Sequence, residues 1–164
     1  MPSDSFGLKF HHMGLALKKE DKALIFLDGL GYDPSRPVYD PEQKVNLRLC
    51  TAENKPSVEL ITPGTEPGPL DNILKKYNEL IYHTCYETEN LGDSLDAIEK
   101  QGLRILPVSP PKPAILFGGR LVSFYTIMGF GLIEILELGK ESLPSSYSCL
   151  SSPEGLNMNK LFPI

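Results

Sequence analysis

The chain has 164 residues, of which 41% are hydrophobic, enough for one well-filled core or two small fused cores but not for two large independent domains. Its formal net charge is −5, and its longest basic runs are the pairs Lys18-Lys19 and Lys75-Lys76. This charge pattern excludes nucleic acid and an acidic membrane surface as partners.

The hydropathy of the chain, its first residues and the spacing of its cysteines all bear on the cellular compartment. No stretch approaches the ~20 apolar residues of a bilayer span, and the first residues are unlike an export signal. The three cysteines, Cys50, Cys85 and Cys149, are an odd number without CxxC spacing, which predicts neither a disulfide framework nor a thiolate zinc site. We therefore expect a soluble protein of the reducing cytoplasm.

The first half of the chain has the pattern of one strand, one helix and three more strands. Residues 8–17 alternate as a strand does, and residues 18–30 place Ala23, Leu24 and Leu27 on one helical face before Gly31. Three short runs bounded by turn-forming residues follow, at 32–39, 44–51 and 57–62.

The same order then repeats after a Gly- and Pro-rich linker and a helix that together span residues 63–79. Residues 80–88 predict a strand, and Asn90 is a candidate cap for a helix that ends at Gly102. Three strands are predicted at 103–108, 120–127 and 131–138, with a loop at 109–119. The order βαβββ thus occurs in two modules, at about 8–62 and 80–138. Together they form one domain of residues 1–138. The Ser- and Pro-rich residues 139–164 are predicted to form a tail.

Four residues occupy matching positions in the two modules. His12, in FHHMG, corresponds to His83, in IYHTC, and both lie on the first strand of their module. Glu59, in VELI, corresponds to Glu134, in IEIL, and both lie on the last strand. Both glutamates are in apolar runs without a nearby Lys or Arg, where an ionised carboxylate needs a cation. Two imidazoles and two carboxylates predict a site for one divalent ion such as zinc, nickel, cobalt, manganese or iron(II).

Each residue also has a plainer explanation. A single His12 or His83 would more often be a hydrogen-bonded core histidine, and either glutamate could face solvent from an edge strand. Their matched occurrence in two repeats favours the metal site. His11 could replace His12 as a ligand, but strand alternation places His11 with Met13, Leu15 and Leu17, so we predict a packing role for it.

These motifs resemble the vicinal oxygen chelate superfamily, which includes glyoxalases, bleomycin resistance proteins and extradiol dioxygenases, and within it the methylmalonyl-CoA epimerases. The resemblance rests on HHMGLAL, DPEQKV, VELITP, GPLDNIL, IYHTCYE and GLIEILE. It implies an α+β fold in which two βαβββ modules pair into an incomplete mixed β-barrel, with metal ligands at His12, Glu59, His83 and Glu134. It also implies a homodimer.

The chain departs from the sequence pattern of the epimerases in two places. The His-Pro-Lys stretch that epimerases often carry before the last strand is replaced by FGGRLVSFYTIMGFG, and Leu47 stands where some epimerases have a carboxylate. Some epimerases also have glutamine as the second ligand, so Glu59 is equally glyoxalase-like. These departures concern the substrate rather than the metal.

The predicted chemistry is proton abstraction beside a thioester or ketone carbonyl, with the metal as Lewis acid. Glu134 is the first candidate for the base, because burial can raise a carboxylate pKa, and Glu59 could return the proton. The substrate would be an acyl-CoA or a glutathione thioester, and Arg120 is a candidate anion contact. The alternatives are a lactoylglutathione lyase and a non-catalytic protein that binds a drug or metabolite; a dioxygenase would use only three protein ligands.

Overall fold

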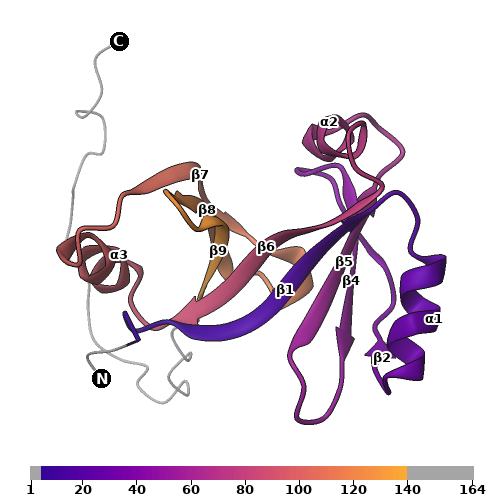
Figure 1. The fold of residues 1–164 in the computed structure, drawn as a ribbon, viewed down its shortest axis with the longest axis horizontal. Coiled ribbons are helices and arrows are strands. Elements are labelled where there is room, and N and C mark those ends of the chain that lie inside the picture. Colours follow the sequence, from indigo (N-terminus) through magenta and orange to yellow (C-terminus); the bar gives the residue numbers. More distant parts are fainter. Residues whose placement is uncertain (1–4, 140–164) are drawn as a thin grey trace, which may run out of the picture.

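The computed structural model describes residues 5–139, which form a nine-stranded mixed sheet and three α-helices (Figure 1). The first module contains β1 (Lys9–Leu17), α1 (Asp21–Gly29), β2 (Asp33–Pro34), β3 (Val38–Asp40), β4 (Val45–Thr51) and β5 (Ser57–Pro63). The helix α2 (Pro69–Leu74) leads into the second module. That module contains β6 (Glu79–Thr88), α3 (Leu91–Lys100), β7 (Ile105–Pro113), the short 3-10 turn η1 (Ile115–Phe117), β8 (Leu121–Ile127) and β9 (Gly131–Glu137).

The two modules have the same internal pairing and meet at their first strands. The strand order is β2-β4-β5-β1-β6-β9-β8-β7, with β3 paired to β4. In each module the first and last strands are parallel neighbours, β1 with β5 and β6 with β9, whereas β1 and β6 run antiparallel at the centre. The sheet is open, since its ends β2 and β7 do not pair. The predicted α+β fold with an incomplete mixed barrel is confirmed.

Each module keeps its helix on one face of the sheet and its glutamate on the other. Val58 and Leu60 of β5 pack with Leu27 of α1, and Ile133 and Ile135 of β9 belong to the cluster that contains Ile98 of α3. Because successive strand residues point to opposite faces, the intervening Glu59 and Glu134 face away from the helices. The two helix-covered cores therefore fix both carboxylates toward the space between the modules.

Two predicted strand boundaries are wrong, and proline explains both. The run 32–39 forms two short pieces, β2 and β3, because Pro37 has no N–H with which to continue the pairing. Conversely, β7 continues through the predicted loop as far as Pro113. It pairs only with β8 and has register shifts at Ser109, and such an edge strand tolerates proline because its outer N–H groups need no partner.

The helices are shorter than their hydrophobic pattern predicts. The helix expected at 18–30 begins at Asp21, and the helix expected after the linker, which was predicted to continue to residue 79, ends at Leu74. None of the helices in residues 5–139 has the length and hydropathy of a membrane span. Cys50 and Cys85 are free buried thiols, whereas Cys149 and the predicted tail beyond Gly139 lie outside the described residues.

The predicted cap of α3 is confirmed, since the Asn90 side chain accepts a hydrogen bond from the Asp93 backbone N–H at 3.1 Å. Replacing Asn90 by alanine should lower the free energy of unfolding by ~1 kcal/mol, because it removes the acceptor of an otherwise unpaired N–H. Denaturant titration measures this change. An Asn72→Ala variant, on the exposed side of α2, serves as the control, and equal stability of N90A and the parent would contradict the capping role.

Candidate metal centre

The four residues matched between the modules converge on one point in the structure. The Nε2 atom of His12 lies 3.5 Å from Oε2 of Glu59 and 3.3 Å from Oε2 of Glu134. The Nε2 atom of His83 lies 3.6 Å and 3.3 Å from the same two oxygens, and 3.3 Å from Nε2 of His12. All four side chains are buried. The structure thus gathers two nitrogens and two carboxylate oxygens from four strands and both modules.

These separations suit a small divalent ion at the centre of the cluster. Donor atoms held ~2.1 Å from an ion lie ~3.4 Å apart in a tetrahedron, close to the five separations above. Oε2 of Glu134 and Nδ1 of His83 are buried without a hydrogen-bond partner, and an unpaired buried carboxylate oxygen is costly unless a cation neutralises it. The mixed nitrogen and oxygen set matches first-row divalent metals. The residues present therefore fit the ion that the sequence predicts.

Two bulges in the central strand pair, β1 and β6, lie beside His12 and His83 and orient these side chains. Phe10 pairs with Tyr86 and His12 with Cys85, which leaves His11 as an extra residue on β1. Gly14 pairs with His83 and Leu15 with Ile81, which leaves Tyr82 as the extra residue on β6. A bulge turns the side chains beside it and is common next to functional sites. Each module therefore places one bulged residue directly before its ligand histidine.

In the absence of metal, the histidines and glutamates of the cluster stabilise each other's charged forms. Burial alone would lower the pKa of His12, but the carboxylates of Glu134 and Glu59, 3.3 Å and 3.5 Å from its Nε2, outweigh this effect and raise the pKa to about 9. Burial would raise the pKa of Glu134, but His12 and His83 hold it well below its usual range. The raised pKa expected for Glu134 is therefore wrong, because two imidazoles face this carboxylate in place of an apolar wall.

This charge arrangement makes the stability of the metal-free protein depend on pH. The pKa of His12 is raised on folding, so its contribution is fully present below the ordinary value of 6.5 and is lost as pH rises through about 9. The loss is about 3 kcal/mol. We expect the thermal midpoint of chelator-treated protein to fall between pH 6.5 and 9. Replacing His12 by asparagine should remove this fall, and an equal fall in H12N would contradict the assignment.

Two further residues singled out in the sequence have contacts of their own. His11 is half-buried, and its Nδ1 lies 2.8 Å from Nδ1 of His12, so the predicted packing with Met13 and Leu15 is wrong because the bulge turns it. Burial and the charge of His12 lower the pKa of His11. Arg120 donates to the Glu137 carbonyl at 3.0 Å and lies 3.2 Å from the Glu87 carboxylate. An anion contact by Arg120 stays a prediction, since this guanidinium already has an anionic partner.

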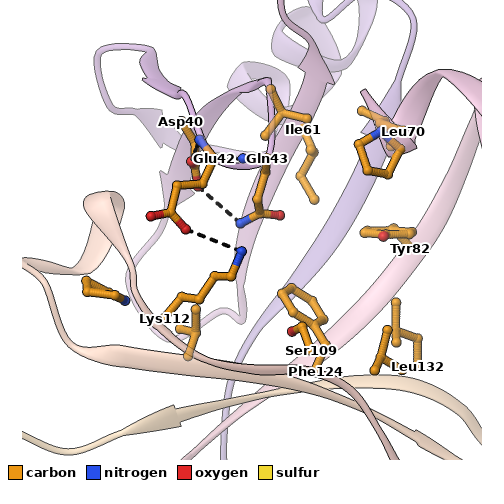
Figure 2. Close-up of a pocket in the computed structure, with 15 residues that line it drawn as sticks. Asp40, Glu42, Gln43, Ile61, Leu70, Tyr82, Ser109, Lys112, Phe124 and Leu132 are labelled. Atoms are coloured by element: carbon orange, nitrogen blue, oxygen red, sulfur yellow. Dashed lines mark hydrogen bonds and ion pairs between the residues drawn. The ribbon is translucent and has the colours of Figure 1, made fainter. Parts of the chain in front are cut away.

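Two cavities with a partly shared lining, an outer part and an inner part, adjoin each other beside the cluster. The outer part, about 220 Å³, lies between the turn after β3 and strands β6, β7 and β8 (Figure 2). The inner part, about 20 Å³, is lined by Glu59, His83 and Glu134 and is covered by η1. The two parts share the lining residues Asp40, Gln43, Ile61, Tyr82, Val122 and Phe124. The inner part has room for about one water molecule or one carbonyl oxygen.

The mouth of this cavity contains residues that sequence reasoning did not single out. Lys112 of β7 lies 3.4 Å from Glu42, which connects the two modules across the opening (Figure 2). Asp40 is buried, and its carboxylate accepts hydrogen bonds from the Glu42 and Gln43 backbone N–H groups and from the Gln43 side chain. The DPEQ sequence, with aspartate before a turn, is the only local signal for this arrangement.

The sequence model of the Glyoxalase/Bleomycin resistance protein/Dioxygenase superfamily matches residues 11–124. The chain belongs to this superfamily. Three of the four cluster residues lie within the matched segment of the glyoxalase superfamily, and Glu134 lies beyond it. The position of Glu134 in the centre therefore rests on the structure and on the internal repeat.

Similarity to individual glyoxalase-superfamily members points to epimerases. The chain is 28% identical over 106 residues to the ethylmalonyl-CoA/methylmalonyl-CoA epimerase of Cereibacter sphaeroides, covering 63% of this chain and 78% of that protein. Its fold matches methylmalonyl-CoA epimerase from Mycobacterium tuberculosis, with a TM-score of 0.68 at 20% identity over 85% and 94% of the two chains. It also matches a Streptomyces coelicolor methylmalonyl-CoA epimerase in complex with 2-nitronate-propionyl-CoA, with a TM-score of 0.62 at 19% identity over 79% and 96%. The enzyme class these similarities support is an epimerase.

Proposed function

We propose that the protein is a metal-dependent epimerase that inverts the carbon next to the thioester carbonyl of an acyl-CoA such as methylmalonyl-CoA. The observation that carries the proposal is the buried cluster of four donor atoms at the inner end of a cavity. The similarity to epimerases that act on ethylmalonyl-CoA and methylmalonyl-CoA supports this substrate class. Zinc, nickel, cobalt and manganese all suit the donor set.

His12, Glu59, His83 and Glu134 would hold the ion, which would supply Lewis acidity to the carbonyl oxygen beside the reacting carbon. The protein itself positions the acyl group. Ile61, Tyr82 and Phe124 line both parts of the cavity, and these largely apolar walls keep water away from the carbon that loses its proton. The narrow inner part admits the carbonyl group, and the wider outer part accommodates the rest of the acyl chain.

The proton steps would use the two carboxylates. Glu59 and Glu134 come from different modules and both line the inner part of the cavity. Inversion requires removal of a proton from one face of the carbon and delivery of a proton to the other face. We infer that Glu134 and Glu59 perform these two steps, one on each face. The neighbouring histidines hold the pKa of Glu134 low in the metal-free protein, so Glu59 is a second candidate for the removal step.

The test is loss of the α-proton signal of methylmalonyl-CoA in deuterated water, followed by proton NMR with metal-loaded and chelator-treated protein. We expect exchange only in the loaded protein, and also with ethylmalonyl-CoA. If the loaded protein instead converts only the hemithioacetal of methylglyoxal and glutathione, it is a lactoylglutathione lyase and the proposal is wrong. Binding of these thioesters without any turnover would indicate a non-catalytic binding protein. A homodimer and a cytoplasmic location stay predictions.

A further inference from the structure

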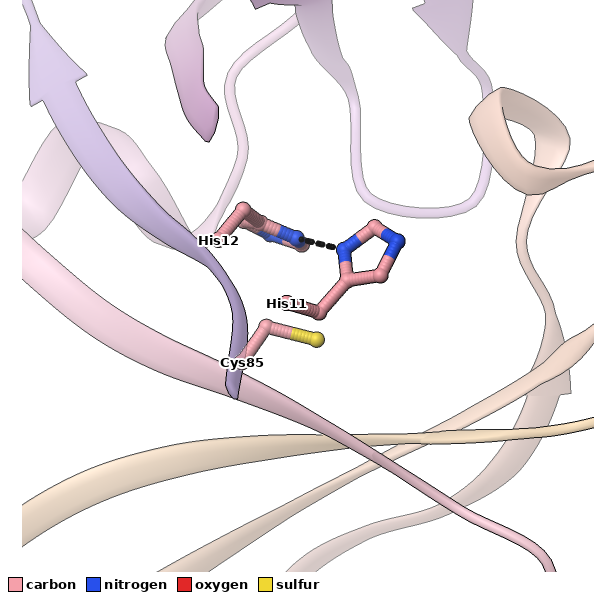
Figure 3. A group of neighbouring side chains, drawn as sticks. All are labelled: His11, His12 and Cys85. Carbon is pink, nitrogen blue, oxygen red and sulfur yellow. Dashed lines mark hydrogen bonds between the residues drawn. The ribbon is translucent and has the colours of Figure 1, made fainter. Parts of the chain in front are cut away.

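The two ligand histidines differ in what holds their second ring nitrogen. Nε2 of His12 faces Glu59, Glu134 and His83, and its Nδ1 lies 2.8 Å from Nδ1 of His11 (Figure 3). Nδ1 of His83 is buried and has no hydrogen-bond partner among residues 5–139. Among the described residues, only the ligand histidine of the first module therefore has a side chain hydrogen-bonded to its second ring nitrogen.

The direction of the His11–His12 hydrogen bond follows from the chemistry of imidazole. A metal-binding Nε2 must offer its lone pair, so the proton of a neutral His12 is on Nδ1. His12 then donates this proton, and Nδ1 of His11 accepts it. His11 in turn must carry its own proton on Nε2. Such a partner on the second nitrogen orients a metal ligand and makes it more basic, a task that a carboxylate or a carbonyl usually performs.

Packing holds the His11 ring in place for this contact. The bulge on β1 makes His11 the extra residue between the pairs Phe10–Tyr86 and His12–Cys85. The His11 ring meets Phe117 of η1 edge to face, with centroids 5.2 Å apart, and Phe117 also lies 5.3 Å from the His12 ring. The segment that covers the inner cavity thus also restrains the hydrogen-bonded histidine pair.

The same side chains could be taken for a second metal site. The ring nitrogens of His11 and His12 and Sγ of Cys85 lie within 4.8 Å of one another (Figure 3). However, the 2.8 Å separation of the two nitrogens is an ordinary hydrogen-bond length, and Cys85 is fully buried within an apolar cluster that includes Val122 and Leu136. A hydrogen bond accounts for the geometry without a second ion.

We propose that His11 is a positioning residue for the metal ligand His12, accepting its Nδ1 proton and fixing its ring so that Nε2 points at the ion. The proposal rests on the metal site of the proposed function. It predicts that the acceptor atom at position 11, rather than an imidazole as such, determines metal affinity. Asparagine can place its Oδ1 near the position of Nδ1, whereas glutamine carries its oxygen one bond further out and leucine has no acceptor.

The test compares the affinity of metal-free wild type, H11L, H11Q and H11N for Co²⁺, measured by competition with a chromophoric chelator and by the visible absorption of the bound ion. We expect one ion per chain throughout, with affinity ~10–100-fold weaker in H11L and H11Q and close to wild type in H11N. The control is Y77F, which changes an exposed tyrosine that lines neither part of the cavity and should leave metal affinity unchanged. Circular dichroism verifies that each variant folds.

Wild-type affinity in H11L and H11Q would overturn the proposal, as would an H11N variant that binds no better than H11L. Two ions per wild-type chain would overturn it as well, in favour of a second site at His11, His12 and Cys85. A wild-type protein that binds no ion would contradict both this proposal and the metal centre. A protein that binds one ion but exchanges no thioester proton would refute only the proposed function.

Discussion

Replacing Gly14 by alanine should abolish metal binding at near-physiological ion concentrations. A Cβ atom on Gly14 would lie 2.3 Å from Cε1 and 2.6 Å from Nδ1 of His83. The His83 ring cannot retreat easily, because it is buried and lies against the rings of Tyr82, Phe124 and His12. Changes around a ligand cost ~10–100-fold in metal affinity, so moving a ligand itself should cost more than ~100-fold. Competition with a chromophoric chelator measures this loss.

The matched control for this substitution is Gly29→Ala. A Cβ atom on Gly29, the last residue of α1, has nothing within 4 Å, so metal affinity should be unchanged and stability unchanged or slightly higher. Circular dichroism of G14A then distinguishes a displaced ligand from an unfolded chain. Wild-type metal affinity in a folded G14A protein would mean that His83 is not held against Gly14.

Replacing Glu134 or Glu59 by glutamine should slow proton exchange at the α carbon by ~100-fold or more, the contribution expected of a positioned acid or base. Glutamine keeps an oxygen that can contact the ion but cannot take up a proton. The single variants E134Q and E59Q should therefore lose exchange by more than they lose metal. Proton NMR in deuterated water measures exchange, and metal analysis of the same samples measures occupancy.

The control for the carboxylate variants is Glu66→Gln, which changes a mostly exposed glutamate that is paired with Lys44 and lines neither part of the cavity. Comparison of E134Q with E59Q separates the two proposed roles. Unchanged exchange in one variant, at full metal occupancy, would make that residue a ligand only. Unchanged exchange in both would place the base elsewhere, and the buried Asp40 at the cavity would then be the next residue to replace.

The sequence alone is sufficient to predict the repeated fold and the four convergent donors. The signal is strong because strand alternation and helix periodicity are local properties, and because Glu59 and Glu134 interrupt apolar runs at matching positions. The structure confirms that β5 and β9 turn these two carboxylates to the face opposite their helices. An internal repeat supplies a second, independent copy of the same pattern within one chain.

Several departures from these predictions arise from strand irregularity and from the position of a strand in the sheet. Alternation assigned His11 to the face of Met13, but a bulge adds a residue to β1 and turns His11 toward His12. The prolines at 110, 111 and 113 lie in the segment predicted as a loop, 109–119, but they belong to an edge strand, where missing N–H groups are tolerated. Edge position and register depend on the partner strand, so no single stretch of sequence contains that information. The pKa of Glu134 likewise depends on imidazoles from two other strands.

The most direct test of the metal centre is the number of divalent ions bound per chain. Metal-free protein titrated with Zn²⁺ or Co²⁺ in a calorimeter should bind one ion at a single site, and binding should be lost in H12A and H83A, which remove one ligand from each module. Because the pKa of His12 is about 9 without metal, binding at pH 7 should release about one proton, measured from the dependence of the heat on the buffer. A wild-type protein that binds no ion, or an H83A variant that binds as well as wild type, would contradict a centre built from both modules.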